Sequence, residues 1–491
     1  MTHKDIAIVF DCGATNVRVI AMNRSGQIIA AQSMPNETDE DPYYPGGRVW
    51  DIDKLWSKLC KATKTVTAQI DVDQIAGITV TTFGVDGTFI DDKGAPLYPI
   101  ISWQCARTQP IMDNIGKYMP LEEVYQISGV YPYAFNTINK MIWFKENRPE
   151  VIEQADRYLF ISSILASKLS GVYQNDATMM GTSMMADIGK RDLSEKILNT
   201  LGIDLEKFGS IGEPGDQVGG VTESAALATG LPETTPVFLT GHDTQFAIFG
   251  SGAELNQPVL SSGTWEIIMT RSSSFSSSIK ELKNNLTTEL DSISGVYNIG
   301  QNWLGSGVLE WFAKNFYPNL SGDALYEKMI HDAEQEVPGS EGISVDPAFY
   351  DDGTSKNSGT IRGLKIDTRK GQVYRAFLES LAYRLREGLE AIEEAGEFKN
   401  DCIICVGGGS KNMLWNQLRA DVCNTPIHLI DQKETTVLGA AMFVFSGSGV
   451  YSTPEAAREK ITYNPKVITP SKNINIYNQL YKQFLEFKNK P

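Results

Sequence analysis

The chain has 491 residues, of which 42% are hydrophobic and 21% charged, and its formal net charge is −16. This length exceeds one ordinary hydrophobic core and predicts about two to four domains. The strong acidity argues against nucleic acid or an anionic membrane as a partner. A polyanionic ligand must therefore be held by backbone N–H groups, helix N-termini and a metal ion rather than by a basic surface.

The N-terminus and the cysteines bear on location. Residues 1–5 lead into a short apolar strand without the features of a signal peptide, and no apolar run approaches the roughly 18 residues of a membrane span. Six cysteines are few for this length, which is typical of free thiols in a reducing compartment. Cys402 and Cys405 form a CxxC, but positions i and i+3 of a strand face opposite sides. We expect a cytoplasmic protein without a redox or zinc site here.

The first part of the chain predicts a β-meander followed by a helix and a buried strand. Apolar runs recur at hairpin distance, and the turn between the first two reads Asp-Cys-Gly-Ala-Thr-Asn. A β-branched run further on ends in Phe-Gly-Val-Asp-Gly. The expected strands are 6–10, 17–22, 27–32 and 75–82, and the expected helix is 53–69.

The middle of the chain, residues 110–230, predicts mostly helix. The clearest segment is 151–169, which we expect to be one helix with an interruption at Ser162 and Ser163. Further helices are expected at 134–147 and 194–202, before a strand at 236–240.

The second half begins much as the first does. It carries a strand, a turn rich in glycine and hydroxyl groups, a returning strand and a set of helices. A serine-rich stretch at 272–278 is expected to be a surface loop. The expected strands are 258–260, 266–270, 401–406 and 427–430, and the expected helices are 245–253, 371–394, 413–423 and 437–445. This weak internal duplication predicts two α/β domains of similar plan.

The turn after the first strand suits phosphate binding. Gly13 and Ala14 allow backbone amides to approach a phosphate closely, and Thr15 and Asn16 can donate hydrogen bonds. Asp11 can hold Mg²⁺ through water. The alternative is an ordinary hairpin with a turn-forming aspartate, and the spacing alone leaves both open.

Two turns of the second half have related chemistry. Ser261-Ser262-Gly263-Thr264 follows a strand as the first turn does, although alone it is also compatible with any polar turn. Residues 407–412, Gly-Gly-Gly-Ser-Lys-Asn, lie between a strand and a helix, where close backbone approach and the helix N-terminus favour an anion. This segment matches neither a Walker A motif nor GxGxxG, and a plain glycine-rich turn is its alternative.

Gly241-His242-Asp243-Thr244 places a carboxylate at the end of strand 236–240, where open α/β sheets place their chemistry. Asp243 is a candidate general base that takes a proton from an alcohol attacking a γ-phosphate. The alternative is an N-cap for a helix beginning at Thr244 or Gln245. Asp86, at the end of strand 75–82, is either a turn former or a polar contact to a polyol.

A further segment contains Trp103 and Arg107, an aromatic ring and a fork-type donor that suit a sugar. The alternative is a buried tryptophan and a surface arginine.

Taken together, these segments resemble the FGGY family of carbohydrate kinases from Asp11 to about Tyr451. The stretches that carry the resemblance occur in one order: DCGATN, TTFGVDG, YPIISWQCART, ISGVYPYAFNT, GHDTQFA, SSGTWE, VGGGSKNMLWNQ and ETTVLGAAM. The resemblance implies an α/β fold of two actin/hexokinase-like (ribonuclease H-like) domains with an interdomain cleft. It implies an N-terminal domain over 1–244 for sugar and phosphate, a C-terminal nucleotide-binding domain over 245–450, and a helical extension over 451–491.

The resemblance also implies roles for individual residues, with Asp243 as the catalytic base and Asp11 as the anchor of Mg²⁺. The candidate sugar contacts are Gly84, His242, Thr244 and Asn302, to which the turn argument adds Asp86. The candidate ATP contacts are Gly13, Ala14, Thr15, Asn16, Val17, Arg18, Gly263, Thr264, Glu310, Gly408 and Gly409.

The implied activity is ATP-dependent phosphorylation of a ketose. TTFGVDG with PIISW, GHDTQFA and SSGTWEI are most similar to members that phosphorylate L-fuculose at its C1 hydroxyl, and members that act on L-rhamnulose come next. Kinase activity on L-rhamnulose or D-ribulose, or a non-catalytic sugar or nucleotide sensor on the same fold, are the alternatives. The implied partners are ATP and a small sugar, without nucleic acid or membrane, and a homodimer stays open.

Overall fold

The structure is a computed structural model that describes residues 4–349 and 358–488. Residues 1–3 and 489–491, at the ends of the expected regions 1–244 and 451–491, lie outside the described residues. The chain forms two compact units, and each is assembled from segments that are separate in the sequence. The first unit is Met1–Gly252, Ser273–Asn298 and Glu434–Thr462, and the second is Ala253–Ser272, Ile299–Lys433 and Tyr463–Pro491. The expected functional division at 244 and 450 stays a prediction.

The first unit contains a six-stranded sheet in the order β14-β15-β6-β1-β2-β3. β1 pairs antiparallel with β2, and β2 with β3, which confirms the predicted meander. β1 also pairs in parallel with β6, and β6 with β15. All residues of β1 and β6 are buried, because helices cover both faces of these central strands. The bounds are β1 Ile6–Cys12, β2 Asn16–Asn23, β3 Ile28–Pro35, β6 Ile75–Thr82, β14 Gln217–Gly220 and β15 Pro236–Phe238.

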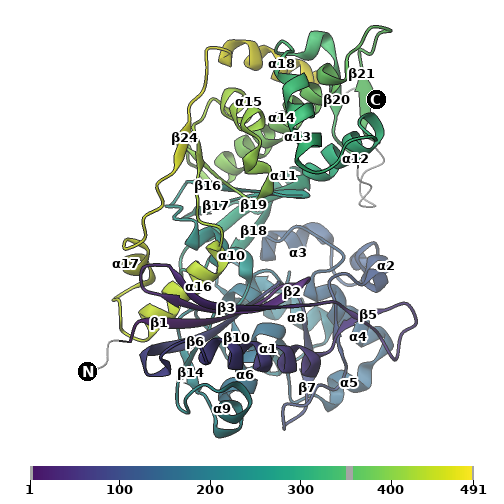
Figure 1. Ribbon diagram of the computed structural model, residues 1–491. Helices are drawn as coiled ribbons and strands as arrows, with labels where there is room; N and C mark the ends of the chain where they lie inside the picture. The colour runs from purple at the N-terminus through teal and green to yellow at the C-terminus, as the bar shows by residue number, and fades with distance from the viewer. Residues whose placement is uncertain (1–3, 350–357, 489–491) are drawn as a thin grey trace. The chain divides into compact units, whose positions relative to one another are not determined.

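Helices of the first unit cover the sheet from both sides. α1 (Ile52–Thr67) and α6 (Ile161–Ser170) lie on one face, and α16 (Thr435–Gly447) lies on the other together with α10 (Asp243–Gly250) (Figure 1). α10 and α16 approach closely, since a Cβ on Gly250 would lie 2.0 Å from the carbonyl oxygen of Thr435. The glycine therefore sets the position of the helix that begins with Asp243.

The sheet of the second unit repeats this plan. Six strands of this seven-stranded sheet follow the order β19-β17-β16-β22-β23-β24. β16 pairs antiparallel with β17 and in parallel with β22, and β22 pairs in parallel with β23. β24 pairs antiparallel with β23 at the edge of the sheet, as β14 does with β15 in the first unit. The predicted internal duplication is confirmed. The bounds are β16 Pro258–Ser262, β17 Trp265–Ser272, β19 Tyr297–Leu304, β22 Ile403–Val406, β23 Ile427–Leu429 and β24 Lys466–Ile468.

One helix prediction is wrong. Residues 151–169 form α5 (Pro149–Gln154), a strand β9 (Arg157–Phe160) and α6 rather than one helix. β9 pairs antiparallel with β7 (Gly87–Ile90), so a partner far away in the sequence selects the strand conformation. A short apolar run alone does not distinguish a buried strand from a buried helix.

The other elements complete the two units. In the first unit they are β4 Asp39–Glu40, β5 Arg48–Trp50, β8 Ile100–Ile101, α2 Gln109–Met112, α3 Leu121–Ser128, α4 Thr137–Asn147, β10 Asn175–Asp176, α7 Ala177–Gly181, β11 Ala186–Asp187, β12 Asp192–Leu193, α8 Glu195–Leu201, β13 Ile211–Gly212, α9 Glu223–Thr229, α11 Ile279–Lys283, β18 Thr287–Leu290 and α17 Pro454–Arg458. In the second they are α12 Ser306–Phe316, α13 Gly322–Glu334, β20 Ser344–Asp346, β21 Thr360–Arg362, α14 Lys370–Gly396, α15 Met413–Cys423 and α18 Ile474–Lys488.

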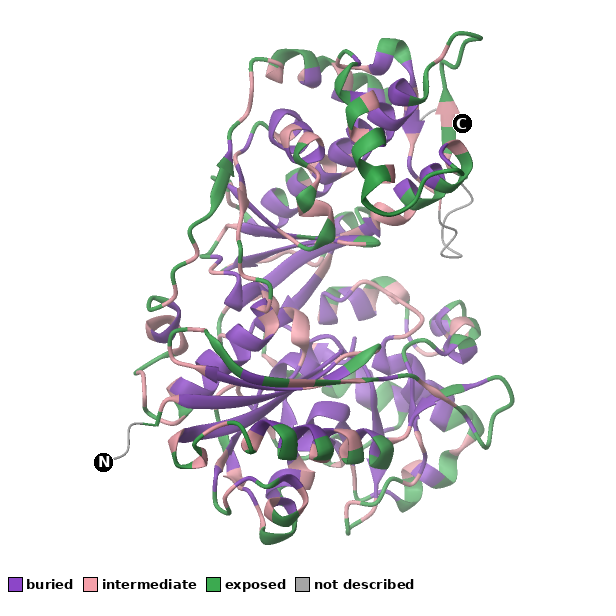
Figure 2. Cartoon of the chain, viewed as in Figure 1, coloured by how far each residue is buried: buried purple, intermediate pink, exposed green. Residues whose placement is uncertain are grey.

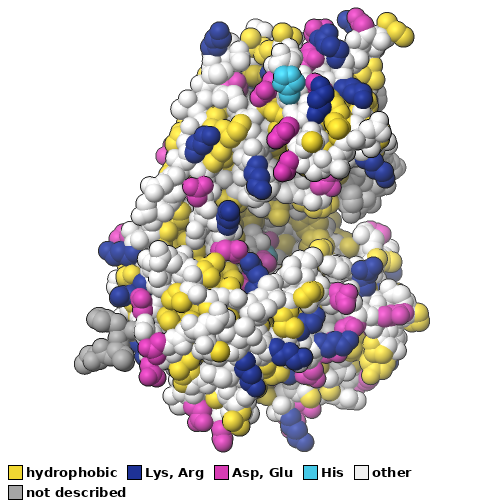
Figure 3. All heavy atoms as spheres, in the orientation of Figure 1, with side chains coloured by type: hydrophobic (Ala, Val, Ile, Leu, Met, Phe, Trp, Pro, Cys, Tyr) yellow, Lys and Arg dark blue, Asp and Glu magenta, His cyan; other side chains and the backbone are white. Residues whose placement is uncertain are grey.

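Burial and charge follow the ordinary pattern of globular units. In each unit the sheet strands are mostly buried and the outer helix faces are exposed (Figure 2). The visible face of each unit carries Lys and Arg side chains interspersed with Asp and Glu (Figure 3). All six cysteines are free. Within the described ranges, the helices are too short or too polar to cross a bilayer.

Candidate active site

The first predicted phosphate turn joins β1 to β2. The amide of Gly13 donates to the carbonyl oxygen of Asn16 at 2.9 Å and closes the turn. Asn36 braces it from β3's end, donating from Nδ2 to the Gly13 carbonyl and from its amide to the Thr15 carbonyl, at 2.9 and 2.8 Å. Thr15 and Asn16 are exposed and Gly13 and Ala14 half-buried, so this backbone is open to a ligand.

Val17 differs from its neighbours in this turn. Its side chain is completely buried in the core, and its backbone pairs with Cys12 and Met34. Any contact with a nucleotide must therefore come from its main chain.

Asp11 forms an ion-pair chain with Arg18 and Glu434. Arg18 donates from Nε to Oδ2 of Asp11 at 2.8 Å, and its Nη2 bonds to the same oxygen. Nη1 of Arg18 lies 2.8 Å from Oε2 of Glu434, which precedes α16. Burial raises the pKa of Asp11 and Glu434 adds to this, while Arg18 opposes it. Asp11 is thus a carboxylate held in one orientation through a single oxygen.

Asp243 is the first residue of α10. The N-cap position belongs to His242, whose side chain makes no capping hydrogen bond, so the alternative that Asp243 is the N-cap is wrong. A negative charge in the first turn is favoured by the helix dipole. About a third of the Asp243 side chain is exposed, at 32%. Its surroundings nevertheless remove enough water to raise its pKa; Asp11 adds to this and His242 opposes it.

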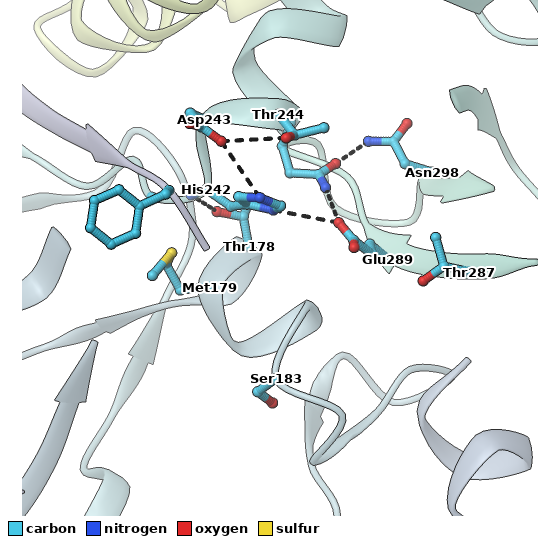
Figure 4. Close-up of polar contacts among 12 residues, drawn as sticks. Thr178, Met179, Ser183, His242, Asp243, Thr244, Thr287, Glu289 and Asn298 are labelled. Carbon is cyan, nitrogen blue, oxygen red and sulfur yellow. Dashed lines mark hydrogen bonds and ion pairs between the residues drawn. The ribbon is translucent and has the colours of Figure 1, made fainter. Parts of the chain in front are cut away.

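The imidazole of His242 lies between two carboxylates (Figure 4). Nε2 is 3.5 Å from Oδ1 of Asp243, and Nδ1 is 3.4 Å from Oε2 of Glu289. Gln245 donates a hydrogen bond to that oxygen of Glu289, at 2.6 Å. Burial alone would lower the pKa of His242, but Glu289, Asp243 and Asp176 together raise it. The site therefore favours a protonated imidazole.

Hydrogen bonds involving the buried residues Asp176 and Thr178 hold the backbone of Gly241 and His242 in place. The amide of His242 donates to the hydroxyl of Thr178 at 2.9 Å, and that hydroxyl donates to Oδ1 of Asp176. A Cβ on Gly241 would lie 2.1 Å from the same carboxylate oxygen, so only glycine fits. The turn before Asp243 is thus fixed by α7 as well as by its own strand.

Gly84 meets His242 from the end of β6. A Cβ at Gly84 would lie 2.9 Å from the His242 ring. The next residue, Val85, has φ of 65°, a left-handed conformation that a β-branched residue rarely adopts. Its carbonyl accepts hydrogen bonds from Lys140 at 3.0 Å and Thr137 at 2.9 Å, which hold the turn in place. Backbone strain of this kind clusters at functional sites.

Asp86 is completely buried, and both of its carboxylate oxygens are engaged by the protein. Lys140 forms an ion pair with Oδ1, while Trp50 Nε1 and the Trp103 amide donate to Oδ2 at 2.7 and 3.0 Å. Burial raises the pKa of Asp86, and Lys140 opposes this. Its sugar contact stays a prediction.

Trp103 and Arg107 differ from the alternative expected from the sequence, which was a buried tryptophan and a surface arginine. Trp103 is 37% exposed, whereas the Arg107 side chain is fully buried against Asp41 at 2.6 Å. Trp103 therefore remains accessible to a ligand and Arg107 is structural.

A surface pocket of the first unit lies apart from Asp243. It measures about 390 Å³ and lies in the first unit between β4, β5 and the start of α1, with Trp50, Lys54 and Pro99 in its lining. Its lining includes none of the predicted site residues.

In the second unit, the turn between β16 and β17 is built into the start of α12. The Thr264 carbonyl accepts from the amides of Gly305 and Gly307 at 2.9 and 3.2 Å, and the Gly263 carbonyl accepts from Ser306 at 2.9 Å. The same helix carries Glu310, which is exposed. The structure therefore joins the predicted contacts Gly263 and Thr264 to the helix of Glu310.

A buried ion pair stands behind this turn. Arg419 of α15 pairs with Glu266, and both side chains are completely buried. Arg419 also donates to Oγ of Ser262 at 2.7 Å, and Trp303 donates to Glu266 at 2.9 Å. The guanidinium carbon lies 3.7 Å from the ring centroid of Trp415. β16, β17 and α15 are thereby locked together.

The glycine-rich turn packs on the same network. A Cβ on Gly409 would lie 2.1 Å from Oγ of Ser262, whereas Gly408 faces open space. Gly409 thus lies against Ser262, next to Gly263 and Thr264 in the chain, and Gly408 precedes Gly409 in the same unit. Asn302, a predicted sugar contact, is half-buried on β19.

The sequence argument missed Glu289, Gln245 and Arg419. Glu289 is a charged residue in a short strand whose neighbours are buried, and Arg419 interrupts the apolar face of α15. A buried charge in an apolar context is the signal that was available.

Comparison with known proteins identifies the class. The model of the "FGGY family of carbohydrate kinases, N-terminal domain" matches residues 6–250, and that of the C-terminal domain matches 259–447. The chain belongs to the FGGY family of carbohydrate kinases. It is therefore a two-domain sugar kinase of the actin/hexokinase-like fold, as the sequence predicted.

Individual relatives narrow the comparison. L-Fuculokinase of Escherichia coli (strain K12) is 43% identical over 467 residues, covering 95% of this chain and 98% of the relative. L-Fuculokinase of Haemophilus influenzae (strain ATCC 51907 / DSM 11121 / KW20 / Rd) is 41% identical and covers 95% and 100%. Rhamnulokinase of Bacteroides thetaiotaomicron is more distant, at 26% identity over 93% and 95% of the two chains.

Solved structures share the fold. Xylulose kinase from Rhodospirillum rubrum superimposes with a TM-score of 0.89 at 21% identity over 98% of each chain. Plasmodium falciparum glycerol kinase with ADP has a TM-score of 0.87 at 18% identity over 100% of this chain and 99% of that one.

Proposed function

We propose that this protein phosphorylates L-fuculose with ATP at the C1 hydroxyl, with Asp243 as the general base. The observation that carries the proposal is the position of Asp243 at the start of α10, with a raised pKa beside Asp11 and His242. A raised pKa makes the carboxylate a better acceptor for an alcohol proton. The substrate follows from the relatives named L-fuculokinase.

The proposed chemistry is a direct transfer. The C1 hydroxyl loses its proton to Asp243 as its oxygen bonds to the γ-phosphorus, and the bond to ADP breaks. The turn residues Gly13 to Asn16 supply backbone and side-chain donors to phosphate oxygens. Positioned hydrogen-bond donors stabilise the charge that develops during transfer.

The other predicted site residues keep their roles as proposals. In the first unit Gly84, Asp86, His242 and Thr244 contact the sugar, and Val17 and Arg18 extend the phosphate turn. In the second unit Asn302 contacts the sugar, while Gly263, Thr264, Glu310, Gly408 and Gly409 bind the nucleotide.

Magnesium would be held at Asp11. In proteins Mg²⁺ is often bound by one or two carboxylates together with phosphate oxygens and water. In the described parts of the chain, no three or more His, Cys, Asp or Glu side chains are grouped for a metal ion. Asp11 fits a site with a single protein carboxylate, because Arg18 bonds only to its Oδ2 and leaves Oδ1 for the ion. When bound, the ion neutralises phosphate charge.

We place the reaction in the cytoplasm. The six free cysteines are compatible with a reducing compartment.

The decisive variant is Asp243→Asn. Since a positioned base contributes about 10²- to 10⁴-fold, kcat should fall by about 10² or more while ADP and ATP still bind, as measured by titration calorimetry. Asp51→Asn makes the same change at the N-cap of α1 and should leave kcat unaltered. Near-wild-type turnover by the Asp243 variant would remove the proposed role.

The sugar is tested separately. ADP release is measured with L-fuculose, L-rhamnulose, D-ribulose and L-xylulose, and we expect the highest kcat/KM with L-fuculose. A preference for another ketose would refute the substrate and keep the kinase, whereas ligand binding without ADP release from any sugar would refute catalysis.

A further inference from the structure

Glu289 is a buried carboxylate whose position is set by α10. It lies on β18, and its side chain is 10% exposed. Gln245 donates to Oε2 at 2.6 Å and in turn accepts from the completely buried Asn298. Because Gln245 belongs to the helix that begins with Asp243, Glu289 and Asp243 are held relative to one another.

The imidazole of His242 fills the space between these two carboxylates. Its Nδ1 is buried 3.4 Å from Glu289, an ion-pair distance without the geometry of a hydrogen bond. Its ring also abuts Gly84, where a Cβ would lie 2.9 Å away. The ring therefore has little freedom to turn, and Nε2 faces Asp243 (Figure 4).

The two oxygens of Asp243 are not equivalent in this arrangement. Nε2 of His242 lies 3.5 Å from Oδ1, and the hydroxyl of Thr244 donates to the same oxygen at 3.3 Å. Because the Thr244 hydroxyl donates to Oδ1 and the imidazole lies at ion-pair distance from the same oxygen, Oδ2 is the oxygen left to accept an alcohol proton.

Several charges surround the imidazole. Asp243 faces it from α10, Glu289 from β18 and Asp176 from β10, while Asp11 of β1 acts on Asp243 and is itself paired with Arg18 of β2. When protonated, the imidazole is thus the local counter-charge to the carboxylates of Asp243 and Glu289.

We propose that Glu289 is a positioning residue for the base: it holds His242 through Nδ1, so that Nε2 engages Oδ1 of Asp243 and directs Oδ2 to the sugar hydroxyl. This inference rests on the proposed role of Asp243. During transfer the hydroxyl proton moves to Oδ2, the new oxygen–phosphorus bond forms and the bond to ADP breaks. Glu289 itself touches neither substrate.

Glu289→Gln tests the proposal, because the amide oxygen can still accept from Gln245 while the charge is removed. We expect kcat to fall about tenfold or more, a part of the about 10²- to 10⁴-fold that a base contributes, with KM for ATP unchanged. The acid limb of the kcat–pH profile should move to higher pH, because His242 is protonated less readily without Glu289 and then lowers the pKa of Asp243 less.

The matched control is Glu281→Gln. Glu281 is another buried glutamate of the segment Ser273–Asn298, and its carboxylate accepts from Ser276 at 2.9 Å and from Ser278. This variant should lower thermal stability without changing kcat or the pH profile. An equal change in both variants would mean that Glu289 is merely structural.

A double-mutant cycle locates the effect. If Glu289 acts through His242, adding Glu289→Gln to His242→Asn should change kcat by less than about twofold. An equal loss in both backgrounds, or a rise only in KM for the sugar, would overturn the positioning role. If Glu289→Gln does not fold, Glu289→Asp replaces it, and wild-type kcat there would also overturn the proposal. Activity retained by Asp243→Asn would refute the proposed base instead.

Discussion

The two phosphate-type turns occupy equivalent places in sheets of the same plan, yet they hold their carboxylates differently. In the first unit Asp11 pairs with Arg18, whose side chain is 31% exposed. In the second unit Glu266 pairs with Arg419, and both side chains have no exposure. Asp11, at the end of β1, is itself buried but has a partly exposed partner, whereas Glu266 and its partner Arg419 of α15 are both fully buried. A duplicated scaffold thus carries one carboxylate whose ion pair reaches the surface and one whose ion pair is fully enclosed.

The largest expected effect is that of Arg419→Met. It leaves Glu266 charged and buried without its cationic partner, which should cost about 3–5 kcal/mol in the free energy of unfolding measured with urea. Adding Glu266→Gln should recover part of the loss, since the unpaired charge disappears. A loss below about 1 kcal/mol would mean that this pair behaves as a surface ion pair, and the two turns would then not differ in how their ion pairs contribute to stability.

The next effect concerns Gly409. In Gly409→Ala the new Cβ would meet Oγ of Ser262, which Arg419 and Glu266 hold in place. Overpacking of this kind should cost about 1–3 kcal/mol in chemical denaturation. Gly408→Ala adds a methyl group to open space and serves as the control, with stability near that of the unaltered protein. Equal stability of both variants would show that the turn can shift to make room for the new methyl group without cost.

A third case is a buried carboxylate without a basic partner. Asp176 accepts hydrogen bonds from Thr178 and Met179, and burial raises its pKa to about 7. The folded state therefore binds a proton that the unfolded state releases, and this stabilisation is present below about pH 4 and is lost as the pH rises toward 7. The slope is at most about 1.4 kcal/mol per pH unit.

The measurement is urea unfolding between about pH 5 and pH 8. Asp176→Asn should flatten the pH dependence of the free energy of unfolding in this range. An unchanged slope would mean that Asp176 stays ionised in the folded protein.

The smallest expected effect is that of Arg18→Met on stability. The pair with Asp11 is partly exposed, so its loss should cost less than about 1 kcal/mol, and the difference should shrink as salt is added. Thermal unfolding at low and high salt checks this. A cost as large as that of Arg419→Met would erase the distinction between the two turns.

Most of the scaffold was predictable from local patterns. The meander, the strand Ile75–Thr82 and the helix Met413–Cys423 follow the expected bounds, because apolar spacing and turn residues act over a few positions. β9 was missed because its strand conformation depends on pairing with β7, which is remote in the sequence.

The candidate site was predictable only in part. The turns of Asp11 and Asp243 were visible as polar residues at strand ends. Glu289 and Arg419 lie outside these turns, and their importance arises from burial against His242 and Glu266. A side chain's burial and its partner are properties of the folded chain, so no local spacing records them.

The sequence by itself therefore determined the α/β class, the duplicated plan and the residues at each strand end. The tertiary structure decided that the segment Ser273–Asn298 joins the first unit and brings Glu289 to His242, and that α15 covers Glu266. The physical reason is the sequence distance over which each effect acts. Strand and turn preferences depend on neighbouring residues, whereas a buried ion pair depends on which segments, far apart in the sequence, pack together and exclude water.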